Sequence, residues 1–211
     1  IWTLTDDSDG MISQVKGLAN ELGKNITEIK TDLIFPWNKL PPGIIPTFGW
    51  IFKNKIPLNI SPNIVISCGR KSVFLSKHLK KNLPNIVNIH IQNPKISKNY
   101  FTFVVVPIHD NLIGENVIRS IGAIHHLKKN NIRSNGIGSK KLNLISCIIG
   151  GENKHYYFNE KQTYDICKKI RDIKKRNPSF EILIITSRRT DSKTKIILKK
   201  QLSSISKLWL G

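Results

Sequence analysis

The chain alternates short apolar, β-rich runs with segments of helical periodicity, and this alternation constrains its fold more than any other feature. In the first half, strand-like runs cover residues 1–5, 26–34, 63–67, 86–91 and 101–106. Between the first two runs, apolar residues from Met11 to Leu22 recur at helical spacing, and Gly23 ends the pattern. Such alternation predicts an α/β fold with a parallel sheet.

The pattern pauses at residues 128–141 and then restarts. This stretch reads KKNNIRSNGIGSKK, which is polar and has no hydrophobic periodicity. After it, strand-like runs at 142–149 and 180–186 flank a helical face, as in a βαβ unit. We predict two Rossmann-like parallel-sheet domains, residues 1–127 and 142–211, joined by a linker at 128–141. We expect the second domain to be incomplete and the chain to be a fragment.

The charge of the chain is strongly positive. Lys and Arg total 34 against 14 Asp and Glu, a net charge of +20. Such an excess of positive charge is typical of proteins that bind a nucleic acid or an anionic membrane. The basic residues are dispersed and not interleaved with aromatic ones, which disfavours a nucleic-acid groove. Phosphate-bearing ligands and an anionic membrane surface remain open as partners.

The cysteines and the apolar runs indicate the compartment. Cys68, Cys147 and Cys167 are odd in number and widely spaced, which suits a reducing environment better than a disulfide framework. No pair has the spacing of zinc ligands, and no apolar run approaches the ~20 residues that a bilayer-spanning helix needs. We therefore expect a cytoplasmic protein without a bound metal, with peripheral attachment to the inner membrane left open.

An acidic turn follows the first predicted strand. Ligands of parallel sheets bind beyond the carboxyl ends of the strands, where helix N-termini converge. Asp6, Asp7 and Asp9 lie at such an end, and their mutual repulsion calls for compensation. They are candidates for an acid/base site or for binding a substrate hydroxyl. The alternative is a solvated helix start, for which Ser8 and Asp9 are suitable capping residues.

A small, basic turn follows the strand at 63–67. Its glycine would let a ligand approach the backbone, and its cations favour an anion. The predicted anion- or substrate-binding residues here are Gly69, Arg70, Lys71 and Ser72. Cys68 is an alternative nucleophile if the helix N-terminus lowers the pKa of its thiol, although no partner base is identifiable.

Two further strand ends carry Gln92 and the pair His109 and Asp110. We expect Gln92 to contact substrate. A histidine beside an aspartate at a strand end can act as a general base, so both residues are catalytic candidates. The competing interpretation is a hydrogen-bonded surface histidine.

In the second predicted domain, polar and basic residues follow both predicted strands, at 142–149 and 180–186. A Gly-Gly turn lets backbone N–H groups reach a pyrophosphate, and the next strand end supplies further donors. The predicted phosphate- or donor-binding residues are Gly150, Gly151, Glu152, Asn153, Lys154, Ser187, Arg188, Arg189 and Thr190. The dinucleotide fingerprint G-x-G-x-x-G is absent from the sequence, so we expect no nicotinamide cofactor.

These segments together resemble a known family. The strings TDDSDGMISQVKGLANELG, ISCGRKS, HIQNP, VVVPIHD, IGGENKHY and TSRRT are similar, in order, to the motifs of the Elm (elongated mitochondria) mitochondrial-fission family. The resemblance implies a fold similar to the B-type (GT-B) glycosyltransferases, with a nucleotide-sugar donor on the second domain and an acceptor on the first. Asp9-Gly10 stands where family members usually carry Pro-Gly, and the later stretch that grips the donor ribose is not in this sequence.

Two functional hypotheses follow. The first is a metal-independent, glycosyltransferase-like protein that binds a nucleotide-sugar or another nucleotide diphosphate between two Rossmann-like domains. The second is a non-enzymatic adaptor of the Elm type, which binds a protein partner at a membrane; the plant members that the resemblance includes are implicated in recruiting a dynamin-like GTPase. The Ile-, Lys- and Asn-rich composition indicates a bacterial protein and favours the first hypothesis.

Overall fold

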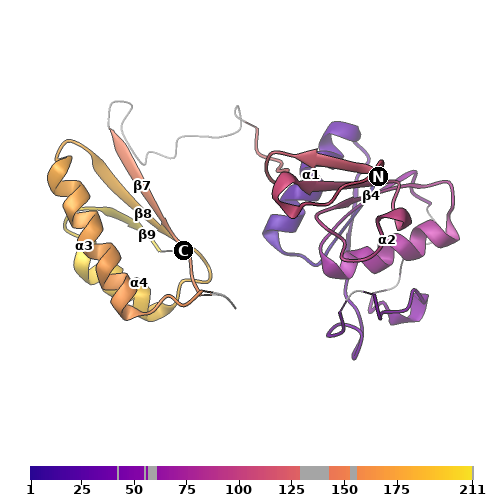
Figure 1. Cartoon of the computed structure of the whole chain (residues 1–211), viewed down its shortest axis with the longest axis horizontal. Coiled ribbons are helices and arrows are strands. Elements are labelled where there is room, and N and C mark those ends of the chain that lie inside the picture. The colour runs from indigo at the N-terminus through magenta and orange to yellow at the C-terminus, as the bar shows by residue number, and fades with distance from the viewer. Residues whose placement is uncertain (42, 55, 57–60, 129–142, 153–155, 211) are drawn as a thin grey trace. The chain divides into compact units, whose positions relative to one another are not determined.

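The computed structural model describes residues 1–41, 43–54, 56, 61–128, 143–152 and 156–210. The chain divides into two compact units, Ile1–Ile132 and Arg133–Gly211 (Figure 1). Apart from Lys128, the predicted linker at 128–141 lies outside the described residues, as does residue 142 at the start of a predicted strand.

The first unit is built on a six-stranded parallel sheet. Its strands are β1 (Trp2–Thr5), β2 (Thr27–Lys30), β3 (Ile64–Cys68), β4 (Val87–Ile91), β5 (Phe103–Pro107) and β6 (Val117–Ser120). They lie in the order β2-β1-β3-β4-β5-β6, and each neighbouring pair is parallel. All four residues of β1 are buried, as expected for a central strand covered on both faces. The predicted parallel α/β class is confirmed.

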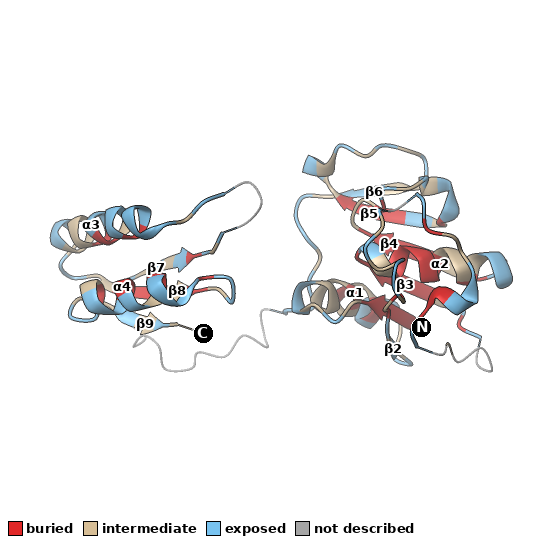
Figure 2. Cartoon of the chain, turned by 90° about the horizontal axis from the view of Figure 1, so that it is seen from below, coloured by how far each residue is buried: buried red, intermediate tan, exposed pale blue. Residues whose placement is uncertain are grey.

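Helices cover both faces of this sheet (Figure 2). Helix α1 (Asp9–Leu22) packs through Val15 and Ala19 against Ile66 and Cys68, which point to one face of β3. Helix α2 (Arg70–Asn82) packs on the other face, where the fully buried Phe74 belongs to the cluster around Leu4 and Val65. Alternate residues of β3 thus feed two different cores, which is why its apolar run is continuous.

After β6, the chain returns across α1. His126 Nδ1 lies 2.9 Å from Ser13 Oγ, and Lys128 pairs with Glu21 at 2.7 Å. A Cβ added at Gly17 would lie 2.7 Å from the backbone carbonyl of His125, closer than real Cβ contacts come. Glycine at position 17 therefore permits this segment to lie against the helix.

Two strand predictions need correction. The second strand was expected at 26–34, but β2 ends at Lys30, and the buried Leu33 forms an antiparallel bridge with Phe52 instead. The chain turns away from the sheet here, where Lys71 of α2 donates a hydrogen bond to Asp32. Strand β6 was not predicted, since its burial is partial and its sequence, VIRS, has no continuous apolar run. An edge strand with little buried surface leaves only a weak sequence signal.

The second unit has a three-stranded parallel sheet in the order β7-β8-β9. Its strands are β7 (Leu144–Ile149), β8 (Glu181–Thr186) and β9 (Lys207–Trp209), and its helices are α3 (Glu160–Arg176) and α4 (Ser192–Leu202). Both helices pack on one core, which contains Cys167, Ile184 and Leu198. The predicted βαβ unit is thus present, and the exposed side chains of Ile148 and Trp209 lie on strands of the same sheet.

Candidate functional site

The neighbouring strands β1 and β3 mark the point where the first sheet changes its direction of growth. Helix α1 leads from β1 to β2, whereas α2 leads from β3 to β4 on the opposite side. In open parallel sheets, the crevice for a ligand lies at the carboxyl ends of such a pair of strands. Residues 6–9 and 69–72, both predicted site segments, therefore begin at this position.

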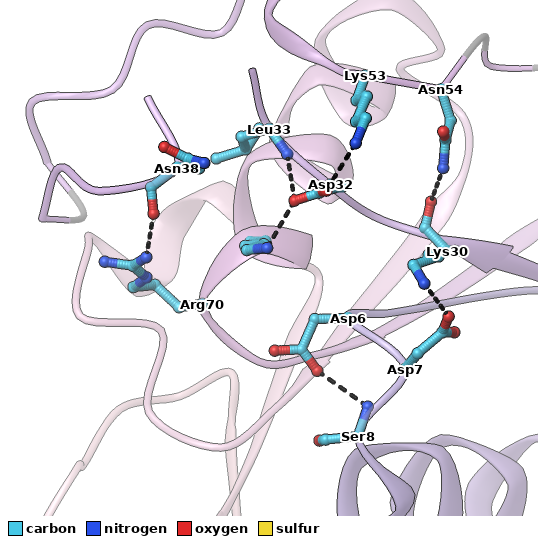
Figure 3. Close-up of polar contacts among 11 residues, drawn as sticks. Asp6, Asp7, Ser8, Lys30, Asp32, Leu33, Asn38, Lys53, Asn54 and Arg70 are labelled. Atoms are coloured by element: carbon cyan, nitrogen blue, oxygen red, sulfur yellow. Dashed lines mark hydrogen bonds and ion pairs between the residues drawn. The ribbon is translucent and has the colours of Figure 1, made fainter. Parts of the chain in front are cut away.

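The acidic turn after β1 is compensated within the unit (Figure 3). Asp7, whose φ is 67°, forms an ion pair of 2.5 Å with Lys30 at the end of β2. The hydrogen bond that Lys30 donates to the Asp7 carboxylate raises the pKa of Lys30. Asp6 Oδ1 accepts a hydrogen bond of 3.2 Å from the backbone N–H of Ser8. Ser8 occupies the N-cap position of α1 without a side-chain capping bond, and Asp9 lies in the first helical turn.

The packing of α1 against the start of α2 requires a glycine at position 69. It adopts a φ of 97°, a conformation that side-chain-bearing residues rarely adopt. A Cβ at this position would overlap Sδ of Met11 on α1. The space that the missing side chain leaves is thus filled by Met11, and the predicted approach of a ligand to this glycine stays a prediction.

The other residues of this turn are engaged by neighbouring side chains and carbonyls. Arg70 donates to the carbonyl oxygens of Asn38 at 2.5 Å and Leu40 at 3.2 Å. Lys71 donates to Asp32 Oδ1 at 2.5 Å, and the buried Ser72 hydroxyl donates to the Gly69 carbonyl at 2.8 Å. The cations predicted to hold an anion are therefore used here to fasten the chain after β2 to α2.

Asp32 is the residue of this network that the sequence analysis missed. The hydrogen bond from Lys71 holds the pKa of its carboxyl below the ordinary value, helped by the backbone N–H of Leu33 and by the charge of Lys53 at 4.0 Å. Figure 3 shows Asp32 between Lys53 and α2. One feature of the sequence could have pointed to Asp32: it is the last carboxylate before a stretch, residues 33–109, that contains no acidic residue.

Cys68 and His90 are core residues. Burial, with a smaller contribution from the Asp6 charge, raises the pKa of the Cys68 thiol to about 12. The thiol is also fully buried, and both features disfavour the alternative of an activated nucleophile, since the thiolate is the reactive form. Burial also lowers the pKa of His90 to about 3, so the imidazole is neutral. Its Nδ1 lies 2.9 Å from Ser67 Oγ, and its ring packs on Phe101.

A hollow of about 400 Å³ lies at the carboxyl ends of β4 and β5. Its lining residues are Gln14, Gln92, Asn93, Lys95, Pro107, His109, Asp110 and Ala123. The structure brings together Gln92, His109 and Asp110, which the sequence placed at two neighbouring strand ends. Lys95 was not predicted. The amide groups can bind the hydroxyls of a substrate, and the neighbouring imidazole can accept a proton from one of them.

The imidazole of His109 is accessible, because it is not bonded to the neighbouring Asp110. His109 Nε2 lies 3.9 Å from Asp110 Oδ1, beyond hydrogen-bonding distance, and the His109 side chain is 77% exposed. Both residues belong to the short 3-10 turn η3 (Ile108–Asp110), directly after β5. Asn111 follows with a φ of 52° and ends this turn.

In the second unit, the loops after β7 and β8 lie against each other. Thr190 Oγ1 lies 2.9 Å from the Gly150 carbonyl oxygen and 3.1 Å from that of Ile149, which also accepts from Ser187 N at 3.0 Å. A Cβ at Gly151 would overlap the backbone carbonyl of Arg189. The two loops therefore lie at the same edge of the sheet, and their convergence on one ligand pocket stays a prediction. Gly151 is required because the other loop approaches it.

The helix N-termini at this edge are capped by the chain itself. Asn159 and Gln162 form a capping box at α3, and Asp191 accepts hydrogen bonds from the N–H and the hydroxyl of Thr194 at α4. The bonds from Thr194 hold the pKa of the Asp191 carboxyl below its usual range. A phosphate at the start of α4 would compete with this carboxylate for the same N–H.

A hollow of about 250 Å³ lies beside these termini. It is lined by Glu152, Phe158, Asn159, Glu160, Asp191, Lys193 and Thr194. Glu152 Oε1 accepts from Phe158 N at 3.1 Å, while Arg188 and Arg189 are exposed on the adjoining loop. The predicted residues Asn153 and Lys154 lie outside the described residues.

Within the described ranges, His, Cys, Asp and Glu form no group of three or more that could hold a metal ion. Of the helices that the structure describes, none combines the length and apolar character needed to span a bilayer.

The architecture gives the class of fold. Two Rossmann-like units with parallel sheets make the fold of this chain GT-B-like. The fold is similar to that of S. aureus MnaA in a co-structure with UDP, at a TM-score of 0.54 and 11% identity, covering 99% of this chain and 67% of that one. The UDP-GlcNAc 2-epimerase of Neisseria meningitidis bound to UDP-GlcNAc matches at a TM-score of 0.47 and 11% identity, with 98% and 70% covered.

The family of the chain follows from its sequence. The family described as Mitochondrial fission ELM1 matches residues 9–211, so the chain belongs to it, as its motifs indicated. An uncharacterized protein of Rickettsia prowazekii (strain Madrid E) is 26% identical over 240 aligned positions, which cover 94% of this chain and 67% of that protein.

Replacing Gly69 by alanine tests its assignment to packing. We expect Gly69→Ala to lower the free energy of unfolding by ~1–3 kcal/mol, because it combines a positive φ with overlap at Met11. Gly10→Ala, at a helical position with open space around it, is the matched control and should be neutral or stabilising. Urea unfolding of both variants measures this, and equal stability for the two would contradict the assignment.

The Asp32 network predicts a dependence of stability on pH. A carboxyl whose folded-state pKa lies below its ordinary 3.8 stabilises the fold above that value, and the contribution is lost as the pH falls through the folded-state pKa. Wild type should therefore lose more unfolding free energy between pH 7 and pH 3 than Asp32→Asn does. The exposed Asp165→Asn in α3 is the control and should follow wild type. An Asp32→Asn curve parallel to wild type would show that the ion pair contributes nothing.

Proposed function

We propose that this protein binds a nucleotide-sugar and transfers the sugar to an acceptor hydroxyl. In this proposal, the diphosphate binds at the loops after β7 and β8, and the acceptor binds in the hollow after β4 and β5. The observation that carries it is the close pairing of the two loops, where Thr190 joins Gly150 at the sheet edge and Arg188 and Arg189 are exposed beside them. The fold, shared with a protein seen with UDP, and the family support the same conclusion.

Arginines fit the diphosphate better than the helix N-termini do. Arg188 and Arg189 follow β8, a strand in which four of six residues are buried. They therefore lie at the carboxyl end of the strand, the edge at which ligands of parallel sheets bind. A guanidinium can hold a phosphate through two parallel hydrogen bonds. The N-terminus of α4 is already neutralised by Asp191. We therefore place the phosphates on the arginine side and a sugar or ribose hydroxyl near Glu152.

The transfer step needs a base and a stabilised leaving group. We propose that His109 removes the proton of the acceptor hydroxyl, whose oxygen then bonds to the anomeric carbon. The bond from that carbon to the diphosphate oxygen breaks, and the nucleoside diphosphate leaves with the electron pair. Arg188 and Arg189 would stabilise the charge on the departing diphosphate. No metal cofactor is part of this proposal.

The other predicted carboxylates take different positions in the scheme. Asp110 would act on His109 by favouring the imidazolium once the proton has moved. Asp7 is a weaker candidate for the base, because its carboxylate is already paired with Lys30. Asp6 and Asp9, beside the same strand end, remain the alternative bases.

Removing one arginine tests the phosphate site. We expect Arg188→Ala and Arg189→Ala each to weaken binding of a nucleoside diphosphate by ~1.5–3 kcal/mol, the value of a hydrogen bond to a charged group. Arg176→Ala, an exposed arginine at the end of α3, is the control and should bind as wild type does. Isothermal calorimetry of the full-length protein with a panel of nucleoside diphosphates measures the affinities. Wild-type binding unaffected by either substitution would exclude the site, and absence of wild-type binding would favour a non-enzymatic adaptor.

Replacing His109 tests the proposed base separately. His109→Gln should lower kcat by ~10²–10⁴-fold, the usual contribution of general base catalysis, while calorimetric affinity for the nucleotide stays at the wild-type value. His125→Gln, an exposed histidine over α1, is the control. Release of nucleoside diphosphate from a nucleotide-sugar donor provides the assay. An unchanged kcat in His109→Gln would move the base to Asp6 or Asp9.

A further inference from the structure

The chain after β2 exposes an unusual group of large apolar side chains. Phe35, Ile44, Phe48 and Trp50 are 74%, 66%, 57% and 61% exposed, and we call them the aromatic surface. The rings of Phe48 and Trp50 are stacked with centroids 6.1 Å apart, and Trp37 meets Trp50 edge-on at 6.0 Å. A group of this kind on one stretch of chain marks an interaction site more often than scattered apolar residues do.

The aromatic surface is held in place by the rest of the unit. The imidazole of His78 in α2 lies 2.9 Å from the Thr47 carbonyl oxygen, and Ile34 N donates to the Ile51 carbonyl at 2.9 Å. The side chains of Ile45 and Ile51 are buried beneath it. Large apolar groups are thus displayed on an anchored segment whose own core positions are filled.

The stretch of sequence that carries the aromatic surface is basic. From residue 33 to residue 109, the sequence contains no acidic residue. The basic residues of that stretch are Lys39, Lys53, Lys55, Arg70, Lys71, Lys77, Lys80, Lys81, Lys95 and Lys98. Lys39 and Lys53 are exposed on the same segment of chain, although Lys53 lies 4.0 Å from the Asp32 carboxylate. Arg70 is bonded to this segment through the carbonyl oxygens of Asn38 and Leu40.

We propose that the aromatic surface docks this protein on an anionic lipid surface. Tryptophan and phenylalanine partition into the interface between headgroups and acyl chains, and neighbouring lysines and arginines are attracted to anionic headgroups. Ile44 offers no ring on which a nucleobase could stack, so the group suits a bilayer better than a single-stranded nucleic acid. The inference is independent of the nucleotide-sugar proposal, because it uses none of the same residues.

Vesicle flotation tests the docking. The full-length protein should float with vesicles of phosphatidylcholine and phosphatidylglycerol (7:3) at low salt, and the bound fraction should fall at high salt or without the anionic lipid. Replacing Phe48 and Trp50 together by serine should reduce the vesicle partition coefficient at least ~10-fold. The matched control replaces Tyr156 and Tyr157, two exposed aromatic residues of the second unit, by serine and should bind as wild type does.

Charge and insertion provide two further readouts. Lys39→Gln should weaken binding ~5-fold, whereas Lys168→Gln on the exposed side of α3 should not. Brominated lipids should quench the tryptophan fluorescence of wild type but much less that of Trp50→Phe. Circular dichroism and urea unfolding show whether each variant is folded. Equal vesicle binding by wild type and the Phe48/Trp50 double variant would overturn the proposal, as would binding to single-stranded nucleic acid or a protein in place of vesicles.

Discussion

The parallel pairing of β1 with both β2 and β3 is the constraint on which the first unit depends. Because β1 is buried along its whole length and central to the pairing, α1 and α2 must cover opposite faces of the sheet. All carboxyl ends consequently meet at one edge, where chain turns carry the polar residues. The same rule, with β8 between β7 and β9, joins the two loops of the second unit through Thr190.

The residues that fill those edges divide into two kinds. Asp7, Lys71 and Arg70 are fastened to Lys30, Asp32 and carbonyl oxygens, so they stabilise the turns that they occupy. His109, Gln92 and Arg189 face solvent or a hollow and are available to a ligand. A strand-end position alone does not separate these kinds, because the same charged residue can serve a ligand or a neighbouring loop.

Sequence reasoning reached the fold class, the central strands and the strand ends, because long apolar periodicity reports burial directly. It missed β6, whose edge position leaves half-exposed polar residues, and it extended β2 past Lys30 because Leu33 and Ile34 are apolar for a different reason. The groups that contact Gly69 and Gly151 could not be predicted from the sequence either. Met11 and the Arg189 carbonyl come close only through helix packing and the meeting of two strands, which no local pattern encodes.

Hydrogen–deuterium exchange of the full-length protein, with and without a nucleotide-sugar, tests most directly whether ligand binding occurs at the carboxyl ends of the strands. The account predicts slower exchange at residues 150–152 and 187–190, and at 92–95 and 109–111 when an acceptor analogue is added. The amino ends of β3 and β4, where residues 61–64 and 82–87 line another hollow, should exchange at an unchanged rate. Protection confined to those amino ends, or no protection at saturating nucleotide-sugar, would contradict the account.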